Sequence, residues 1–104
     1  MAFHAYTRIG ASIAQPTEEQ MRALLDSLAD SDDEHPDVSV THETGWSISA
    51  FHSGLVIFEN VETGEGPWQM RSVSRDATLA LWMLLAGGNI QEIRERPWLP
   101  GDSK

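Results

Sequence analysis

Hydrophobic residues recur at helical spacing in the first third of the chain. Their spacing of i, i+3, i+4 and i+7 places four of them on one side of a helix, and these four are Met21, Leu24, Leu25 and Leu28. Directly before this stripe, Thr17 and Gln20 have the spacing of a capping box, in which two side chains satisfy the backbone amides of a helix start. The pattern therefore predicts an amphipathic helix that begins after Thr17.

Alternation of polar and apolar residues predicts strands at 3–9, 46–52 and 68–73. Residues 55–58 are apolar without interruption, which is typical of a central strand covered on both faces. A further short strand is expected near 38–41, where two valines alternate with polar residues. The strands at 46–52, 55–58 and 68–73 follow one another closely, so we expect them to form an antiparallel meander.

The last third of the chain predicts two helices. Ser74 is a good N-cap for a helix over 77–86, which is apolar nearly all round and is therefore expected to be buried. The glycine pair 87–88 ends this helix, because glycine readily takes the left-handed conformation that closes a helix. Asn89, with a glutamate three residues later, predicts a second capped start, and Pro97 ends that short helix.

A chain of 104 residues has room for one domain, which we place at 1–104. The predicted order is β-α-β-β-β-α-α. We therefore expect an α+β fold with an antiparallel sheet of about four strands and helices packed mainly on one face. With 40% hydrophobic and 22% charged residues, the chain has the composition of a globular domain.

The net charge of −9 argues against nucleic-acid binding by phosphate neutralisation and against attraction to anionic membranes. The absence of cysteine excludes thiolate chemistry and disulfides. The longest apolar run, 79–86, is far shorter than the roughly 20 residues of a membrane span. The N-terminus lacks the order of charged and apolar residues typical of a secretory signal, so we expect a cytoplasmic protein.

No sequence motif indicates a reaction. The four histidines have no metal-binding spacing, and the serines form no nucleophile elbow. Gly64 and Gly66 resemble a phosphate-binding loop only superficially, because Glu62 and Glu65 would repel phosphate. We therefore expect a protein that is not an enzyme, with no cofactor, no metal and no catalytic residues.

Charge placement is the strongest functional signal in the sequence. Residues 1–65 contain twelve acids and two bases, a net charge of −10, whereas residues 66–104 have a net charge of +1. Such a one-sided surface either serves solubility or steers a basic partner. If it binds a partner, we expect the 30–37 and 59–65 loops to form one contact edge. The candidate binding residues are Asp30, Asp32, Asp33, Glu34, Asp37, Glu59, Glu62, Glu65 and Trp68.

The four tryptophans have different expected environments. Trp82 lies in the apolar helix and is predicted to be in the core, and Trp46 and Trp68 open strands at the core or its rim. Trp98 stands between two prolines, so we expect it to be partly exposed. Of these, Trp68 is the candidate aromatic anchor for a partner, because interface energy concentrates in such residues.

The second half has a hairpin, then G-x-G-P-W leading into a strand, a Ser-capped apolar helix, and G-G-N-I leading into a short helix that ends in P-W. With its size, acidity and lack of cysteine, the chain resembles the small immunity proteins of bacterial polymorphic toxin systems, delivered by contact-dependent inhibition or type VI secretion. The resemblance implies a cytoplasmic protein that binds and neutralises one cognate toxin domain, for example a basic nuclease. It transfers no binding residue by position.

Two alternatives from other classes stay open. The chain is also compatible with a small regulatory or structural domain that binds a protein other than a toxin, and one form of this alternative is a homodimer through an edge strand. A third possibility is a small-molecule-binding domain or enzyme, with a pocket between the sheet and the helices. Binding of a metabolite would raise the thermal stability of such a protein.

Overall fold

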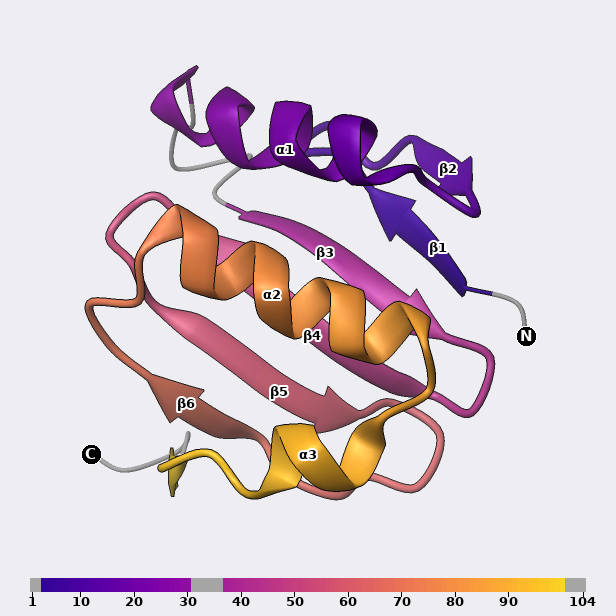
Figure 1. Cartoon of the computed structure of the whole chain (residues 1–104), viewed down its shortest axis with the longest axis vertical. Helices are drawn as coiled ribbons and strands as arrows, with labels where there is room; N and C mark the ends of the chain where they lie inside the picture. Colours follow the sequence, from indigo (N-terminus) through magenta and orange to yellow (C-terminus); the bar gives the residue numbers. More distant parts are fainter. Residues whose placement is uncertain (1–2, 31–36, 101–104) are drawn as a thin grey trace.

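Seven antiparallel strands form one sheet in the computed structural model, which describes residues 3–30 and 37–100 (Figure 1). The order across the sheet is β2-β1-β3-β4-β5-β6-β7. The strands are β1 (Phe3–Tyr6), β2 (Ser12–Ala14), β3 (Asp37–His42), β4 (Trp46–Phe51), β5 (Val56–Asn60), β6 (Trp68–Met70) and β7 (Leu99–Pro100).

The helices lie on one side of this sheet, with α1 over the β1–β3 edge, α2 over the centre and α3 near the end of β5 (Figure 1). They are α1 (Glu18–Asp26), which continues as a 3₁₀ turn (Ser27–Asp30), α2 (Arg75–Ala86) and α3 (Ile90–Arg94). The capping box at the start of α1 is confirmed: the backbone amide of Gln20 donates to Thr17 Oγ1 at 3.1 Å, and that of Thr17 donates to Gln20 Oε1 at 2.8 Å. Ser74 caps α2 in the predicted way.

The hydrophobic core fills the space between the sheet and the helices. Trp82 of α2 is fully buried, as predicted, and its indole N–H donates to the carbonyl of Ile48 in β4 at 3.0 Å. The ring therefore enters the core without leaving its polar atom unsatisfied. The strands supply the opposite wall from alternate positions, which are buried because successive strand residues point to opposite faces.

Strand register places the two ends of the sheet far apart. Asp37 pairs with Phe51 at one end of the β3–β4 ladder, and Trp46 pairs with Asn60 at the other end of the β4–β5 ladder. Five residues of β4 separate these two levels, which corresponds to about 17 Å along an extended strand. A side chain beside Asp37 and one in the β5–β6 loop therefore lie at opposite ends of the molecule.

The predicted α+β class, the antiparallel meander and the one-sided helices are confirmed, but the expected sheet of about four strands is wrong. The 38–41 segment is a full strand, β3, and β2 and β7 add an edge strand on each side. With three and two residues, β2 and β7 are too short for an alternating pattern to be detected in the sequence. The predicted strand 3–9 ends at Tyr6, because the chain turns at 7–10, where the Gly10 amide donates to the Thr7 carbonyl.

Other element predictions also need correction. The 55–58 strand is not covered equally on both faces, because the helices lie on one side and Ile57 is only half-buried on the other. The predicted strand 68–73 ends at Met70, before Ser72 adopts a left-handed φ of 59°. Asn89 precedes α3 but its side chain makes no capping hydrogen bond, so the second predicted capping box is wrong.

Candidate functional site

A surface hollow of about 200 Å³ lies where β5, β6 and α3 meet. Phe58 of β5, Trp68 of β6, Arg94 of α3 and Trp98 line it. Trp98 comes back to the sheet because the chain turns after α3 and β7 pairs with β6. Three aromatic side chains and one guanidinium from distant parts of the sequence thus converge at one place.

The aromatic walls of the hollow continue into a stack of rings. The ring of Phe58 lies between Trp46, at 4.7 Å and 20°, and Trp98, at 5.2 Å and 26°, and Trp68 is 6.2 Å from Trp46. The indole N–H of Trp98 donates to the Ile93 carbonyl at 2.7 Å, which fixes the orientation of that ring. Each such ring pair contributes roughly 0.5–1.5 kcal/mol beyond its buried area.

Arg94 is the cation of the hollow. Its guanidinium carbon lies 5.3 Å from the ring centre of Trp46 and 5.8 Å from that of Trp68, and its Nη1 lies 3.5 Å from Glu65 Oε2. The Arg94 and Glu65 side chains are 43% and 46% exposed. At such exposure the ion pair contributes about 0–1 kcal/mol and the cation–π contacts about as much, so both side chains can be displaced at small cost.

A buried amide holds the loop beside the hollow. Asn60 is 4% exposed, and its Oδ1 accepts the backbone amides of Glu62 at 2.8 Å and Thr63 at 2.9 Å. Its Nδ2 donates to the Thr44 carbonyl at 3.3 Å, which joins the β5–β6 loop to the β3–β4 turn. Gly45 is required at this junction, because a Cβ there would lie 2.6 Å from Asn60 Oδ1, and its φ is +96°.

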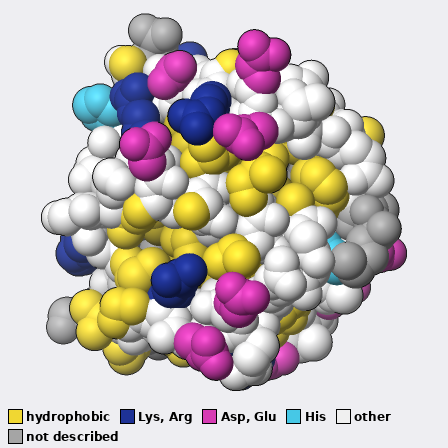
Figure 2. All heavy atoms as spheres, viewed as in Figure 1, with side chains coloured by type: hydrophobic (Ala, Val, Ile, Leu, Met, Phe, Trp, Pro, Cys, Tyr) yellow, Lys and Arg dark blue, Asp and Glu magenta, His cyan; other side chains and the backbone are white. Residues whose placement is uncertain are grey.

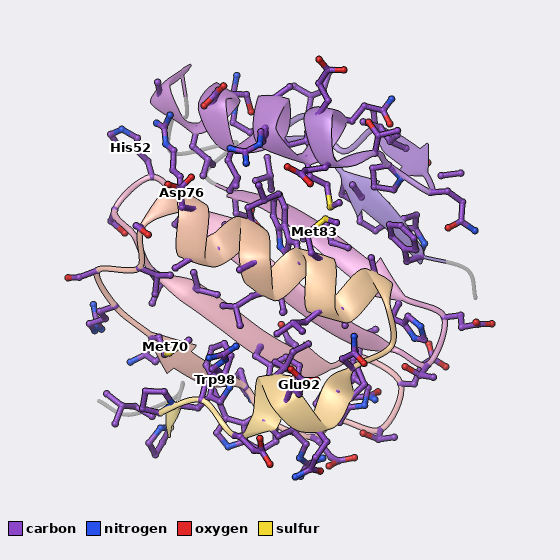
Figure 3. The ribbon with its side chains drawn as sticks, in the orientation of Figure 1. His52, Met70, Asp76, Met83, Glu92 and Trp98 are labelled. Atoms are coloured by element: carbon purple, nitrogen blue, oxygen red, sulfur yellow. The ribbon has the colours of Figure 1, made fainter. Side chains whose placement is uncertain are left out.

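These joined turns and α3 carry a group of exposed glutamates, which we call the acidic end: Glu43, Glu62, Glu65, Glu92 and Glu95. The backbone bond from the Val61 amide to the Gly45 carbonyl and the Arg94–Glu65 ion pair keep the three segments together. Figure 2 shows acidic side chains along the lower rim of the helix-covered face. Figure 3 shows Trp98 and Glu92 near α3, away from His52 and Asp76 at the opposite end.

The structure brings together only part of the predicted contact edge. Glu65 and Trp68 meet at the hollow, and Glu62 lies in the adjoining loop. Glu59 is half-buried on the helix-free face of the sheet, paired across the strands with Ser47. Three predicted residues lie outside the described part of the chain, namely Asp32, Asp33 and Glu34. The side chain of Asp30 is also outside it.

Asp37, the described end of the 30–37 segment, does not share an edge with the 59–65 loop. The strand register separates them by the length of β4, so one contiguous contact edge through Asp37 and 59–65 is wrong. Conversely, Arg94 and Trp98 belong to the hollow and were not among the predicted binding residues. Local sequence pattern signals only that Trp98 is partly exposed, which the structure confirms, and nothing near Arg94 indicates the rings above which it lies.

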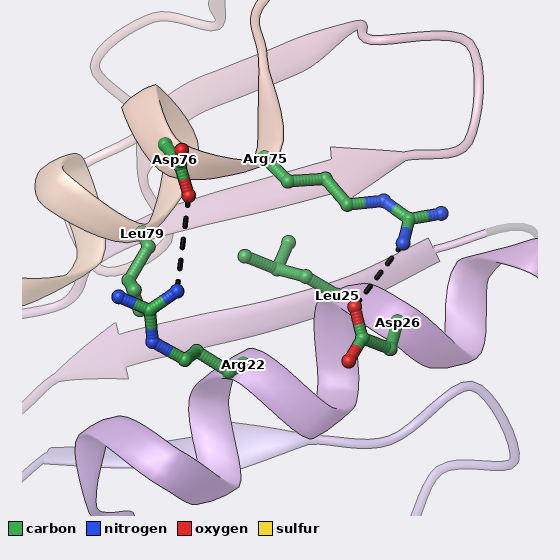
Figure 4. Close-up of a pocket in the computed structure, with 6 residues that line it drawn as sticks. All are labelled: Arg22, Leu25, Asp26, Arg75, Asp76 and Leu79. Atoms are coloured by element: carbon green, nitrogen blue, oxygen red, sulfur yellow. Dashed lines mark hydrogen bonds and ion pairs between the residues drawn. The ribbon is translucent and has the colours of Figure 1, made fainter.

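A second charged region, which we call the α1–α2 junction, has a different character (Figure 4). Arg75 Nη1 lies 3.1 Å from Asp26 Oδ1, and Arg22 contacts both Glu18 at 3.2 Å and Asp76 at 3.7 Å. Leu25 and Leu79 lie between these pairs. Each of these acids therefore forms an ion pair with an arginine, either of the other helix or of the next turn of the same helix. Figure 2 shows charges of both signs over α1 and the start of α2.

The titratable side chains of the described residues differ in position and surroundings. No group of three or more His, Cys, Asp or Glu side chains there could hold a metal ion. His42 is buried at the end of β3, where its Nδ1 accepts the Thr44 amide at 3.2 Å. Desolvation raises the pKa of Asp37 above its usual value of 3.8, and a hydrogen bond to its own backbone lowers it to a smaller extent.

Comparisons of the chain with protein-family models, with curated proteins and with solved structures find no match. Among the described residues, no helix has the length and apolar character required to cross a membrane.

Proposed function

We propose that this protein is an immunity protein, which binds and neutralises a cognate bacterial toxin domain in the cytoplasm. The observation that carries the proposal is the position of the aromatic hollow directly beside the acidic end. The two features serve different parts of binding, since buried aromatic anchors supply much of the binding energy and charges set the rate and orientation of encounter.

A basic nuclease is the kind of toxin that fits this surface. An enzyme that cleaves nucleic acid presents a cationic surface to phosphates, and an acidic protein competes for that surface. Electrostatic steering raises association rates up to about 10⁸–10⁹ M⁻¹s⁻¹ at low salt, which favours capture of the toxin before it acts. The acidic end supplies the charge for this steering, because Glu62, Glu92 and Glu95 make no ion pair within the described residues.

The two alternatives have less support. A homodimer through an edge strand requires an exposed edge with several free backbone groups, but β2 has three residues, and β7 has two, one of which is Pro100. A small-molecule site usually has a volume of roughly 300–1,000 Å³, whereas the aromatic hollow measures about 200 Å³. A hollow of this size accommodates a side chain better than a metabolite.

The test is affinity capture from the native cell, with washes at low and then high salt, followed by mass spectrometry. We expect one basic protein with a toxin-like domain to be retained. The double variant Glu62→Gln/Glu92→Gln should reduce its association rate about 3- to 10-fold at low salt, with little difference at high salt. Glu19→Lys is the matched control, because it changes the net charge by the same +2 at the start of α1, and its association rate should stay close to that of the wild type.

Two results would contradict the proposal. The first is that no basic protein is captured from cells shown to express candidate toxins. The second is that Glu19→Lys and Glu62→Gln/Glu92→Gln slow association equally, since only the overall charge would then matter. A stable homodimer in light scattering would favour the interaction-domain alternative, and thermal stabilisation by a metabolite would favour the small-molecule alternative.

A further inference from the structure

The aromatic hollow has a chemistry that differs from the charge of the surface around it. Three of its four lining side chains present ring faces or edges, and the fourth, Arg94, is a cation. A positively charged side chain that enters the hollow would approach the Arg94 guanidinium and be repelled. The acidic net charge of the protein therefore does not predict what the hollow itself accepts.

An aromatic ring matches every group in the lining. It stacks on Phe58 or Trp98 with the offset geometry that these rings already adopt with each other. The face of the entering ring can also form a cation–π contact with the Arg94 guanidinium, as the rings of Trp46 and Trp68 do. The volume is sufficient, because a cavity of about 150 Å³ already binds benzene, and this hollow measures about 200 Å³.

The hollow is also preorganised for binding an aromatic ring. The hydrogen bond from the Trp98 indole to the Ile93 carbonyl holds one wall in place. Arg94 and Glu65 are held only by weak, exposed contacts, so the guanidinium can move to cover an entering ring while its ion pair is kept. Rigid walls with one adjustable side chain reduce the entropy lost on binding.

We propose that the hollow receives an aromatic side chain of the protein partner, while the basic side chains of that partner contact the acidic end. This inference rests on the proposed function, because it assumes that the partner is a protein. It divides the interface into an aromatic anchor that provides affinity and a charged rim that provides rate and orientation.

The hollow can be tested without the partner, by titrating the 104-residue chain with N-acetyl-L-tyrosinamide, N-acetyl-L-argininamide and N-acetyl-L-leucinamide. The readout is the NMR signals of the tryptophan indole N–H groups. We expect tyrosinamide to bind with a dissociation constant of roughly 0.1–3 mM, as for a ligand of this size in a small site. The other two probes should bind at least about 10-fold more weakly, and the Trp98 and Trp68 signals should shift while that of buried Trp82 does not.

Two variants and a control make the test specific. Trp98→Leu should weaken tyrosinamide binding about 10-fold or more. Arg94 is exposed, so we expect Arg94→Ala to fold. This variant should bind tyrosinamide about 3-fold more weakly, and the ratio between its affinities for tyrosinamide and argininamide should be smaller than in the wild type. Met83→Ala, at the exposed face of α2, should leave all three affinities unchanged.

Tyrosinamide that fails to bind, or argininamide that binds equally well or more tightly, would overturn the inference even if the toxin is captured. Equal tyrosinamide affinity in Trp98→Leu and wild type would overturn it too. If tyrosinamide binds as expected but no protein partner is captured, the proposed function fails. The inference that the bound aromatic ring belongs to a protein partner then fails with it. If both succeed, Trp98→Leu should also increase the dissociation rate of the captured partner at least 10-fold, with little change in association rate.

Discussion

The α1–α2 junction and the acidic end both place arginines next to carboxylates, but the surroundings of these pairs differ. At the junction, Arg22 and Arg75 meet acids from the same or the facing helix, with two leucines between them. At the acidic end, Arg94 pairs with Glu65 above a stack of aromatic rings. The neighbouring Glu62, Glu92 and Glu95 carry no ion pair among the described residues. The junction therefore joins two helices, whereas the acidic end leaves charge and aromatic surface exposed to solvent.

This difference shows that a count of acidic residues along the chain does not locate an acidic surface. Asp26 belongs to the acid-rich first part of the sequence, yet it is matched by Arg75 from the second part. Glu92 and Glu95 belong to the part with a net charge near zero, yet they extend the acidic end. Folding redistributes the charge because it brings sequence-distant residues together.

The largest effect is expected from separating the two turns that, together with α3, carry the acidic end. Gly45→Ala places a Cβ 2.5 Å from Glu62 Cγ and 2.6 Å from Asn60 Oδ1, at a φ of +96°. We expect a loss of about 2–4 kcal/mol in the free energy of unfolding, measured by urea denaturation. Gly64→Ala, at a φ of +81° but with nothing within 4 Å, should cost only about 1 kcal/mol. Equal losses in the two variants would show that the close approach at Gly45 has no energetic effect.

Removing the buried amide tests the same junction from the other side. Asn60→Ala leaves two loop amides and the Thr44 carbonyl without their partner, so the free energy of unfolding should fall by about 2–3 kcal/mol. Asn89→Ala is the control: since the side chain of Asn89 makes no capping hydrogen bond, the loss should stay within about 0.5 kcal/mol. A loss of 1 kcal/mol or more for Asn89→Ala would instead support the cap expected from the sequence.

A smaller effect on stability is expected from removing an arginine of either region, Arg94 at the acidic end or Arg75 at the α1–α2 junction. Arg94→Ala and Arg75→Ala should each lower the free energy of unfolding by no more than about 1 kcal/mol, because both ion pairs are exposed. Only Arg94→Ala should shift the NMR signals of the Trp46 and Trp68 indoles, since its guanidinium lies over those rings. The comparison between the two regions would be wrong if Arg75→Ala produced the same shifts.

The smallest effect concerns pH at the opposite end of the sheet. Because desolvation raises the pKa of Asp37 in the folded state, the folded protein holds this proton more tightly than the unfolded chain does. Its contribution to stability is therefore fully present below about pH 3.8 and is lost as pH rises through the folded-state pKa. Asp37→Asn should be slightly more stable than wild type at pH 7, by less than about 0.5 kcal/mol, and this difference should disappear in acid. A difference independent of pH would show that the titration of Asp37 is not its cause.

Much of the fold follows from local pattern. The capping box at Thr17 and the cap at Ser74 mark where α1 and α2 begin, and alternation marks the meander, because these signals depend on neighbouring residues alone. The edge strands β2 and β7 escape prediction, since two or three residues form a strand only when a partner strand is already present.

The candidate site is predictable to a much smaller extent. Glu65 lies in the β5–β6 loop and Trp68 follows directly after it, so composition and turn signals are sufficient to select both residues. Arg94 and Trp98 join them only through the pairing of β7 with β6 and the position of α3, which no local pattern encodes. The grouping of Asp37 with the 59–65 loop fails for the related reason that strand register, not loop composition, decides which ends meet.

The aromatic stack has an optical consequence. Trp46 and Trp68 lie 6.2 Å apart with their ring planes within 21°, close enough for their electronic transitions to couple. Coupled indoles of fixed geometry give a paired positive and negative band in circular dichroism, which isolated tryptophans lack. The folded protein thus carries an intrinsic spectroscopic signature of the ring stack beside the hollow, and a change in the relative position of Trp46 and Trp68 will be visible without a label.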